Sequence, residues 1–311
     1  MLARMFSCIS LNSRTVRASC LLSLGALSCS LASAEVDIDR AADRLKFEQA
    51  VTELRSGAGP RYKQLRAELI DYPLALYLDA LVIEGDLHHT KPDVIKAFLG
   101  RAVDSPVALR TLRSFVRHKV KDRHWKTVVD VTQHVGLPTE LRCHRAHALL
   151  MTQQIEEATT LLTGLWSVGK SQIKACDPVF KAWYRHSGPS DDVVWQRALR
   201  AADARNTTLL RYLRKFASAT LLVSLQDLGE IYTRPDRVTQ KTRGSTLRQR
   251  DIAVMGVTRL ARINPGRALA AKEALASRFE FTAEQTTQMH SLITRHSLFA
   301  QSAAPQSWIT D

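Results

Sequence analysis

Apolar residues recur at helical spacing along almost the whole chain after Ile38, and they do not alternate as they would in a β-strand. Short polar breaks separate the apolar runs, and breaks of this size are typical of connections between helices. The pattern therefore predicts roughly fifteen helices and an all-α fold. Outside the central stretch, helices are expected over residues 39–54, 62–70, 74–84, 91–102, 106–120, 125–135, 191–204, 207–216, 221–231, 246–263, 265–278 and 282–299, with a loop or short helix over 233–245.

The central stretch, residues 139–188, contains three more predicted helices. Two amphipathic runs lie on either side of a polar break at Gln153-Gln154 and predict a helical hairpin. Gly169 follows the second run, and we expect it to end that helix in a left-handed conformation. Asp177-Pro178 predicts the start of the third helix, with Asp177 as the N-cap. At the far end of the chain, Thr282 and Gln285 predict a capping box.

Consecutive helices joined by short links pack as antiparallel neighbours, and a long series of them stacks into a solenoid. No strict repeat period recurs in this chain. We therefore expect an irregular α-solenoid, or superhelix of stacked helical hairpins, over residues 35–299. Residues 300–311 are expected to form an unstructured tail. A chain of 311 residues with 45% hydrophobic content can bury a sizeable core.

Residues 1–34 have the composition of a secretory signal peptide. Three arginines and no acidic residue precede an apolar run over 21–31 that is too short to span a bilayer. Ala32-Ser33-Ala34 is a small-x-small cleavage site, so we expect cleavage after Ala34. The alternative is a lipoprotein signal with Cys29 as the lipidated residue, but the residues before Cys29 make a poor lipobox. The mature chain is thus expected in the periplasm, with no transmembrane segment.

Cys143 and Cys176 are the two cysteines that remain after removal of this leader. Two cysteines in an oxidising compartment usually pair. A bridge across the intervening residues would remove about 3–4 kcal/mol of unfolded-state entropy. The alternative is a metal site made by Cys143, His144 and His147, but no second ligand pair lies at a zinc-like spacing. We therefore predict a disulfide between Cys143 and Cys176 and assign no metal ligand.

The net charge is +14, and it falls to +11 when the three leader arginines are removed. An excess of basic residues is typical of proteins that bind polyanions. Because an exported protein rarely meets nucleic acid, we expect a carboxylate-bearing cell-wall polymer or another anionic envelope polymer as the partner. Solvated helix faces account for most of these lysines and arginines.

The chain contains no sequence motif of a catalytic centre. A Gly-rich phosphate loop, GxSxG and HExxH are all missing. Glycoside cleavage needs carboxylic acids in an apolar cleft, but Glu156-Glu157 and Asp191-Asp192 lie where helices begin and suit the helix dipole. His88-His89 falls in a predicted loop and is interpreted as solvated. We assign no catalytic or cofactor-binding residue and expect no cofactor.

The tryptophans are the remaining candidates for binding. Trp125, Trp166, Trp183 and Trp195 could stack on sugar rings along a surface. At helical spacing they are more often part of the core, and we expect Trp166 and Trp183 to be buried.

Three stretches resemble soluble lytic murein transglycosylases. Asp71-Tyr72-Pro73-Leu74, with Tyr77-Leu78 after it, is similar to the family's DYPL…YL element. LWSVGKSQIKACDPVFKAW, residues 165–183, is similar to its LWxxGKSQxxACDxxFxxW segment and is the most specific match, and Cys143 falls where the family has its other cysteine. A weaker similarity runs through residues 248–285. All three lie in the family's N-terminal superhelical U-shaped domain.

This resemblance implies a role in peptidoglycan metabolism. The family's lysozyme-like domain carries its catalytic Glu in an ES motif supported by GLMQ and AYN motifs, and none of these occurs here. We therefore expect a periplasmic superhelical module that binds peptidoglycan, does not cleave it alone, and works with a separate catalytic domain or periplasmic protein. Whether the chain is an enzyme stays open. The alternatives are a tetratricopeptide-like periplasmic scaffold for protein–protein contacts and a truncated or frameshifted transglycosylase.

Overall fold

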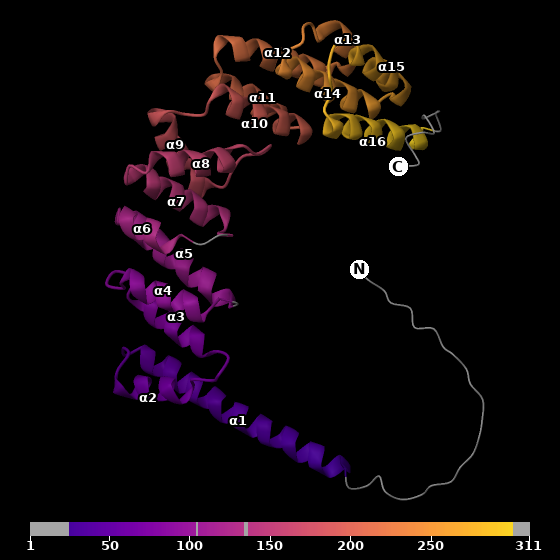
Figure 1. The fold of residues 1–311 in the computed structure, drawn as a ribbon. Helices are drawn as coiled ribbons and strands as arrows, with labels where there is room; N and C mark the ends of the chain where they lie inside the picture. Colours follow the sequence, from indigo (N-terminus) through magenta and orange to yellow (C-terminus); the bar gives the residue numbers. More distant parts are fainter. Residues whose placement is uncertain (1–24, 104, 134–135, 301–311) are drawn as a thin grey trace, which may run out of the picture. The chain divides into compact units, whose positions relative to one another are not determined.

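The structure, a computed structural model, describes residues 25–103, 105–133 and 136–300. These residues form α-helices and short 3-10 helices joined by loops, without a β-strand among them (Figure 1). The predicted all-α class is therefore confirmed. The described chain divides into two compact units. The first contains the residues up to Asp86 and Phe98–Thr111, and the second contains Leu87–Ala97 and the residues from Leu112 onward.

The first unit is built on the helices α1 (Gly25–Leu54), α2 (Pro60–Glu68) and α3 (Ala75–Gly85), and α4 (Pro92–Arg101) and α5 (Pro106–Lys121) contribute residues to both units. The core of the first unit consists of buried apolar side chains from α1, α2 and α3 and from the α2–α3 turn, where Tyr72 of the DYPL element packs on Phe47 with ring centroids 5.8 Å apart. Asp79 accepts two hydrogen bonds from Arg66, at 2.8 and 2.9 Å, and thereby ties α3 to α2.

Helix α1 begins earlier than predicted, at Gly25 instead of Asp39. The added segment is rich in Ala and Leu, which have high helix propensity. The predicted cleavage site after Ala34 thus falls inside α1, while residues 1–24 of the predicted leader and 301–311 of the predicted tail lie outside the described residues. Signal peptide, cleavage site and tail therefore stay predictions. Within the described residues, no helix has both the length and the apolar character needed to cross a bilayer.

The second unit stacks helices that are neighbours in the chain, as expected for a solenoid of helical hairpins. Helix α7 packs on α8, α10 on α11, and α14 on both α15 and α16 (Figure 1). Its α-helices are α6 (Trp125–Val131), α7 (Thr139–Met151), α8 (Ile155–Trp166), α9 (Asp177–His186), α10 (Asp191–Asp203), α11 (Thr207–Leu213), α12 (Ala219–Thr233), α13 (Val238–Lys241), α14 (Leu247–Ala261), α15 (Pro265–Ala276) and α16 (Ala283–Phe299). Its 3-10 helices are η1 (Lys174–Cys176), η2 (Arg214–Phe216) and η3 (Pro235–Arg237).

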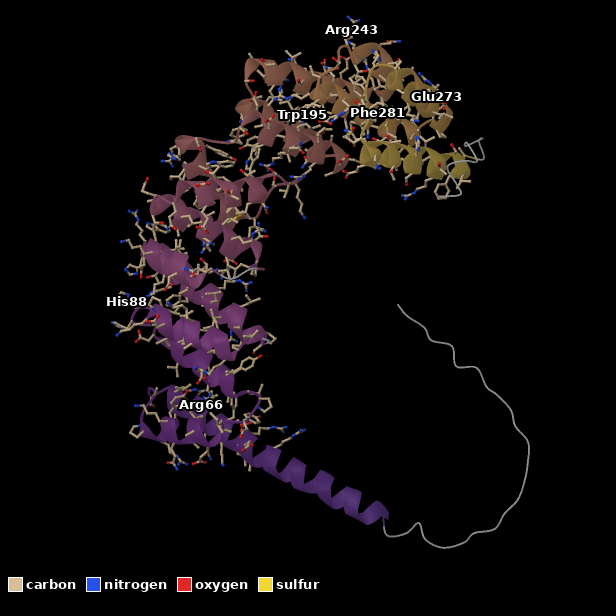
Figure 2. The ribbon with its side chains drawn as sticks, in the orientation of Figure 1. Arg66, His88, Trp195, Arg243, Glu273 and Phe281 are labelled. Atoms are coloured by element: carbon tan, nitrogen blue, oxygen red, sulfur yellow. A yellow bond between two sulfur atoms is a disulfide. The ribbon has the colours of Figure 1, made fainter. Side chains whose placement is uncertain are left out.

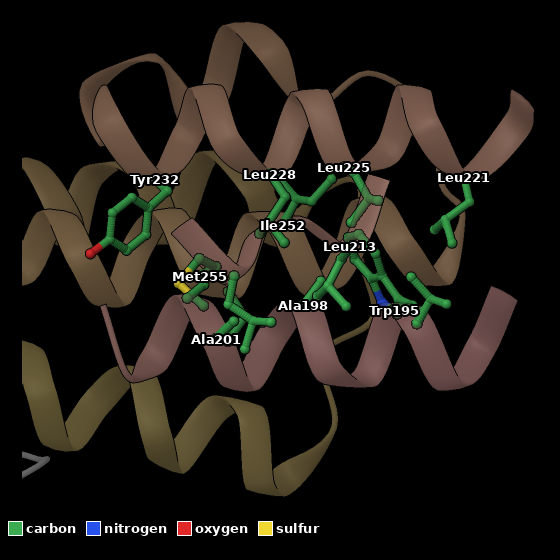
Figure 3. Close-up of a cluster of buried hydrophobic side chains, with 14 of the residues drawn as sticks. Trp195, Ala198, Ala201, Leu213, Leu221, Leu225, Leu228, Tyr232, Ile252 and Met255 are labelled. Atoms are coloured by element: carbon green, nitrogen blue, oxygen red, sulfur yellow. The ribbon is translucent and has the colours of Figure 1, made fainter. Parts of the chain in front are cut away.

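One continuous core runs through this unit from Cys143 to Ile293. Figure 3 shows a section of it, in which side chains of α10, α11, α12 and α14 interlock. Trp195 is 3% exposed, and its indole N–H donates to Asp251 at 2.8 Å, so its polar atom is satisfied within the core. Burial of each large apolar side chain contributes about 1.5–3 kcal/mol. Stability therefore depends on the stacking of successive helices.

Two predictions about helix ends have different outcomes. The capping box at α16 is confirmed, because Thr282 and Gln285 each accept a hydrogen bond from the other's backbone N–H, at 3.2 and 3.1 Å. The prediction that Asp177 is the N-cap of α9 is wrong. Cys176 occupies that position because η1 leads directly into α9, and Asp177 lies in the first turn.

A disulfide joins Cys143 on α7 to Cys176 in η1, with their Cα atoms 5.0 Å apart. Both cysteines are fully buried. The bridge anchors the start of α9 to α7 and thereby fixes the chain that connects α8 to α9. Cys176 lies within the segment, residues 165–183, that most resembles the transglycosylase family.

Replacing Cys176 with Ser should lower the melting temperature of the oxidised protein. Loss of the bridge returns about 3–4 kcal/mol of unfolded-state entropy, which corresponds to roughly 10 °C in a chain of this size. Thermal unfolding followed by circular dichroism measures the effect, and reductant should lower the wild-type value to that of the variant. An unchanged melting temperature, or two free thiols in the native protein, would rule out the bridge.

Candidate functional site

The residues that follow α8 form a turn, Ser167–Gln172, which is held in place by polar side chains from α10 and α11. Arg200 donates to the carbonyl of Ser167, and Asn206 donates to the carbonyl of Gly169 at 3.3 Å. Gln172 donates back to the carbonyl of Leu165 at 2.7 Å. Buried or half-buried backbone groups need such partners. The GKSQ part of the family segment is therefore a fixed loop packed against α10.

Gly169 allows this close packing. A Cβ atom at Gly169 would lie 2.3 Å from the carbonyl oxygen of Arg200 and 3.0 Å from the Cβ of Ala204. The expectation that Gly169 adopts a left-handed conformation is wrong, since Gly169 is not among the residues with positive φ. The glycine is required because the turn approaches the α10 backbone, which the sequence pattern of a helix end does not reveal.

Arg197 is a buried arginine beside this turn. Its side chain is 5% exposed, and its guanidinium carbon lies 4.3 Å from the centroid of the Trp166 ring. It donates to the carbonyl of Lys170 at 3.4 Å. Its Nε–H has no acceptor. Burial lowers the pKa of Arg197, and within the described residues no carboxylate forms an ion pair with it.

Arg197 lines an open cavity of about 570 Å³ between the turn, α9, α10 and α11. This volume is in the range of sites that bind small molecules. The cavity lies wholly within the second unit. Its lining residues are Ser171, Gln172, Asp177, Phe180, Lys181, Tyr184, Arg197, Asn206, Thr208, Leu209 and Tyr212.

Aromatic rings make up much of the cavity wall. Phe180 and Tyr184 stack with centroids 6.4 Å apart, and Phe216 lies behind both Tyr184 and Tyr212, at 4.7 and 5.4 Å. Trp166 donates its indole N–H to the Tyr184 oxygen at 2.6 Å. Burial raises the pKa of Tyr184 to about 12, so this phenol stays neutral at ordinary pH. The rings are therefore held rigidly, and the wall is apolar with polar edges.

The arrangement is suited to binding a carboxylate. Removal of an ion from water costs several kcal/mol, and a desolvated cation–π contact returns about 2 kcal/mol. A carboxylate in the cavity would supply the missing counter-charge, because a guanidinium can bind it through two parallel hydrogen bonds. Lys181 adds a second positive charge at the exposed side, whereas Asp177 is the single acidic residue of the lining.

Most other residues singled out in the sequence have structural roles. Trp166 and Trp183 are 0% and 1% exposed, which confirms that they belong to the core. Glu156-Glu157 and Asp191-Asp192 lie in the first turns of α8 and α10, as the dipole argument expects. Cys143 is in the disulfide and cannot ligate a metal.

The two histidines near Cys143 are half-buried, and the disulfide leaves them without the thiolate ligand that the metal alternative required. Burial lowers the pKa of His144, opposed by the nearby Glu140, and burial likewise lowers the pKa of His147. His147 packs its ring on Trp125 at 4.8 Å. A different group, His88, His118 and Asp122, brings together atoms that could hold a metal ion.

Sequence reasoning missed Arg197 and Asn206. Arg197 lies in a predicted amphipathic helix, where a charged residue is expected to be solvated, and Asn206 lies between two predicted helices. The one available signal was that Arg197 lies on the apolar face of its helix, between Val194 and Ala201. That signal identifies a buried cation but not the cavity around it.

Similar proteins support the resemblance to soluble lytic murein transglycosylases. The curated relatives from Escherichia coli K12 and Salmonella typhimurium LT2 are each 28% identical over 235 residues, which cover 74% of this chain and 36% of the relative. The chain thus spans about a third of the length of these relatives. A profile of the Cucumovirus coat protein family matches residues 149–248, which is less than half of the chain.

Solved structures show the same fold. An inactive mutant of the lytic transglycosylase Slt from Pseudomonas aeruginosa is 27% identical with a TM-score of 0.60, covering 81% of this chain and 41% of the other. The 70-kDa soluble lytic transglycosylase from Escherichia coli is 22% identical with a TM-score of 0.60, covering 86% and 44%. The same 70-kDa enzyme was also solved in complex with bulgecin A, with a TM-score of 0.62. The chain therefore has the superhelical fold found in these transglycosylases.

Replacing Gly169 with Ala should destabilise the protein by about 1–3 kcal/mol, because the turn or the α10 backbone must move to admit the methyl group. Gly164→Ala is the matched control: its new Cβ would meet only the Arg142 guanidinium, at 3.9 Å. In the α8 interior that change should be neutral or stabilising by up to about 1 kcal/mol. Urea unfolding measures both variants, and equal stability of the two would contradict the close approach.

Proposed function

We propose that this chain acts in peptidoglycan metabolism as a helical module that binds the polymer through the cavity beside the Ser167–Gln172 turn. The observation that carries this proposal is the buried guanidinium of Arg197, which lines an aromatic-walled cavity without a carboxylate partner. One side of the same cavity comes from the segment with the most specific resemblance to murein transglycosylases, which supplies Ser171, Gln172, Asp177, Phe180 and Lys181.

The chemistry of peptidoglycan matches the lining of this cavity. The polymer combines sugar rings with short peptides that end in carboxylates. A carboxylate pairs with Arg197 and Lys181, while the faces of Phe180, Tyr184 and Tyr212 suit the apolar side of a sugar ring or an alkyl side chain. The proposed ligand is therefore a muropeptide with a free carboxylate.

The compartment is part of the proposal. A leader cleaved after Ala34 would export the chain to the periplasm, where peptidoglycan is accessible. The buried Cys143–Cys176 bridge supports an oxidising compartment, because disulfides persist there and are rare in the cytosol. No residue of this chain is assigned to cleavage of the glycosidic bond, so binding is the proposed activity.

Arg197→Gln should weaken binding of a soluble muropeptide at least about tenfold, since loss of a desolvated charge pair costs roughly 2–5 kcal/mol. Isothermal titration calorimetry measures the change. Arg197→Lys should give an intermediate affinity, because it keeps the charge but loses the two-point geometry. An amidated muropeptide should bind the wild-type protein as weakly as the free muropeptide binds Arg197→Gln.

Arg211→Gln is the matched control, because it removes an exposed arginine of α11 that does not line the cavity. Circular dichroism establishes whether each variant is folded. Tyr212→Phe alters a side chain at the surface of the cavity and therefore tests whether the muropeptide binds there. High salt should weaken binding only modestly, since buried pairs are screened less than exposed ones. Equal losses in Arg197→Gln and Arg211→Gln, or binding abolished by salt, would indicate non-specific attraction to a basic surface.

Incubation of this chain with purified sacculi should retain the protein on the polymer without producing 1,6-anhydro-muropeptides. Mass spectrometry of the soluble fraction detects such products, with a soluble lytic murein transglycosylase as the positive control. Their appearance would disprove a purely binding role. Failure to bind sacculi, with recovery of a defined protein partner, would favour the scaffold alternative.

A further inference from the structure

Three side chains with metal-ligating atoms meet at the C-terminal end of α5. Asp122 Oδ2 lies 3.2 Å from His118 Nε2 and 3.8 Å from His88 Nδ1. The three ligand atoms lie within 4.8 Å of one another. All three residues belong to the second unit, and Figure 2 shows His88 on the outside of the ribbon, in the loop before α4.

The local structure explains why these residues meet. His118 lies on α5, and Asp122 directly follows the last residue of that helix. The Asp122 backbone N–H still donates to the His118 carbonyl at 3.1 Å, so the two side chains, four residues apart, share one face of the helix end. His88 comes from a separate loop, whose position is fixed by Lys119. That lysine is 5% exposed and donates its ammonium to the carbonyl of His88 at 2.9 Å. A buried polar contact thus holds the backbone of one ligand against the helix that carries the other two.

The geometry is close to that of a coordinated metal. With metal–ligand bonds of about 2.0–2.1 Å, tetrahedral ligand atoms lie roughly 3.4 Å apart. The separation between His118 and Asp122 already matches this value. Moreover, His118 Nε2 is buried and makes no hydrogen bond, although the carboxylate is near. The His88 atom lies farther off, 3.8 Å from Asp122 Oδ2, and the His88 side chain is exposed and can rotate to complete the set.

We infer that His88, His118 and Asp122 form a binding site for a zinc-type divalent cation, with water in the remaining position. Two imidazoles and one carboxylate favour Zn²⁺, Ni²⁺ or Cu²⁺, whereas Mg²⁺ and Ca²⁺ prefer oxygen ligands only. The sequence pattern had predicted no metal ligand and a solvated His88-His89 loop, so a metal site that includes His88 was not expected from it. The bound ion would cross-link the loop to α5. The site is separate from the cavity at Arg197 and independent of the proposed function.

Calorimetric titration of the untagged protein with Zn²⁺ tests the inference. One Zn²⁺ should bind per chain, and His88→Ala and Asp122→Asn should each weaken binding by at least about tenfold. His186→Ala is the matched control, because it removes an exposed histidine of α9 outside the group. His88 is exposed, so its replacement leaves the core intact. With Co²⁺, the wild-type protein should show visible absorption bands of a low-coordinate site, and His88→Ala should lose them.

Persistence of Zn²⁺ binding when excess Mg²⁺ is present would support the preference for nitrogen ligands. Two results would overturn the inference. One is the absence of saturable Zn²⁺ binding to the folded wild-type protein. The other is an equal affinity of wild type, His88→Ala and His186→Ala, which would show that scattered histidines bind the metal.

Discussion

The indole of Trp166 is the contact on which the central part of this fold depends. It is fully buried and touches Trp183 of α9 and Phe216 of η2, with ring centroids 6.1 and 5.6 Å apart. Its N–H donates to Tyr184, and its face receives the guanidinium of Arg197 from α10. One side chain therefore joins the end of α8 to three later elements. In a solenoid, where each helix contacts mainly its neighbours, such a residue sets how the next hairpin follows the previous one.

The turn after Trp166 is constrained from both ends as a consequence. On one side the indole is locked in the core, and on the other the Cys143–Cys176 bridge fixes η1. Between them, Gly169 lies directly against the carbonyl of Arg200. A loop held in this way loses little further entropy when a ligand binds, so the cavity beside it is pre-organised. The segment that fixes the fold at this point is thus also the one to which we assign the proposed binding role.

The sequence was informative where structure depends on near neighbours in the chain. Periodicity located the helices, and Thr282 and Gln285 specified their capping box because both partners lie within one helical turn. It failed for Gly169, whose requirement comes from a backbone 31 residues away, at Arg200. It also failed for His88, which reaches His118 and Asp122 only through the packing of a loop on α5. Contacts between residues distant in the chain are set by packing, and periodicity carries no record of them.

Net charge was a poor guide to the proposed binding site. Exposed basic residues are abundant, and many are matched by carboxylates, as where Lys96 pairs with both Asp93 and Asp130. Such surface pairs contribute little and are screened by salt. Arg197 differs because its charge is buried beside Trp166 and Tyr184 with no carboxylate as counter-charge. Within the described residues this charge is compensated by the Trp166 ring and the Lys170 carbonyl, and no carboxylate forms an ion pair with it. In the proposed function, discrimination between ligands would therefore rest on this desolvated cation, and the exposed basic residues would supply only long-range attraction.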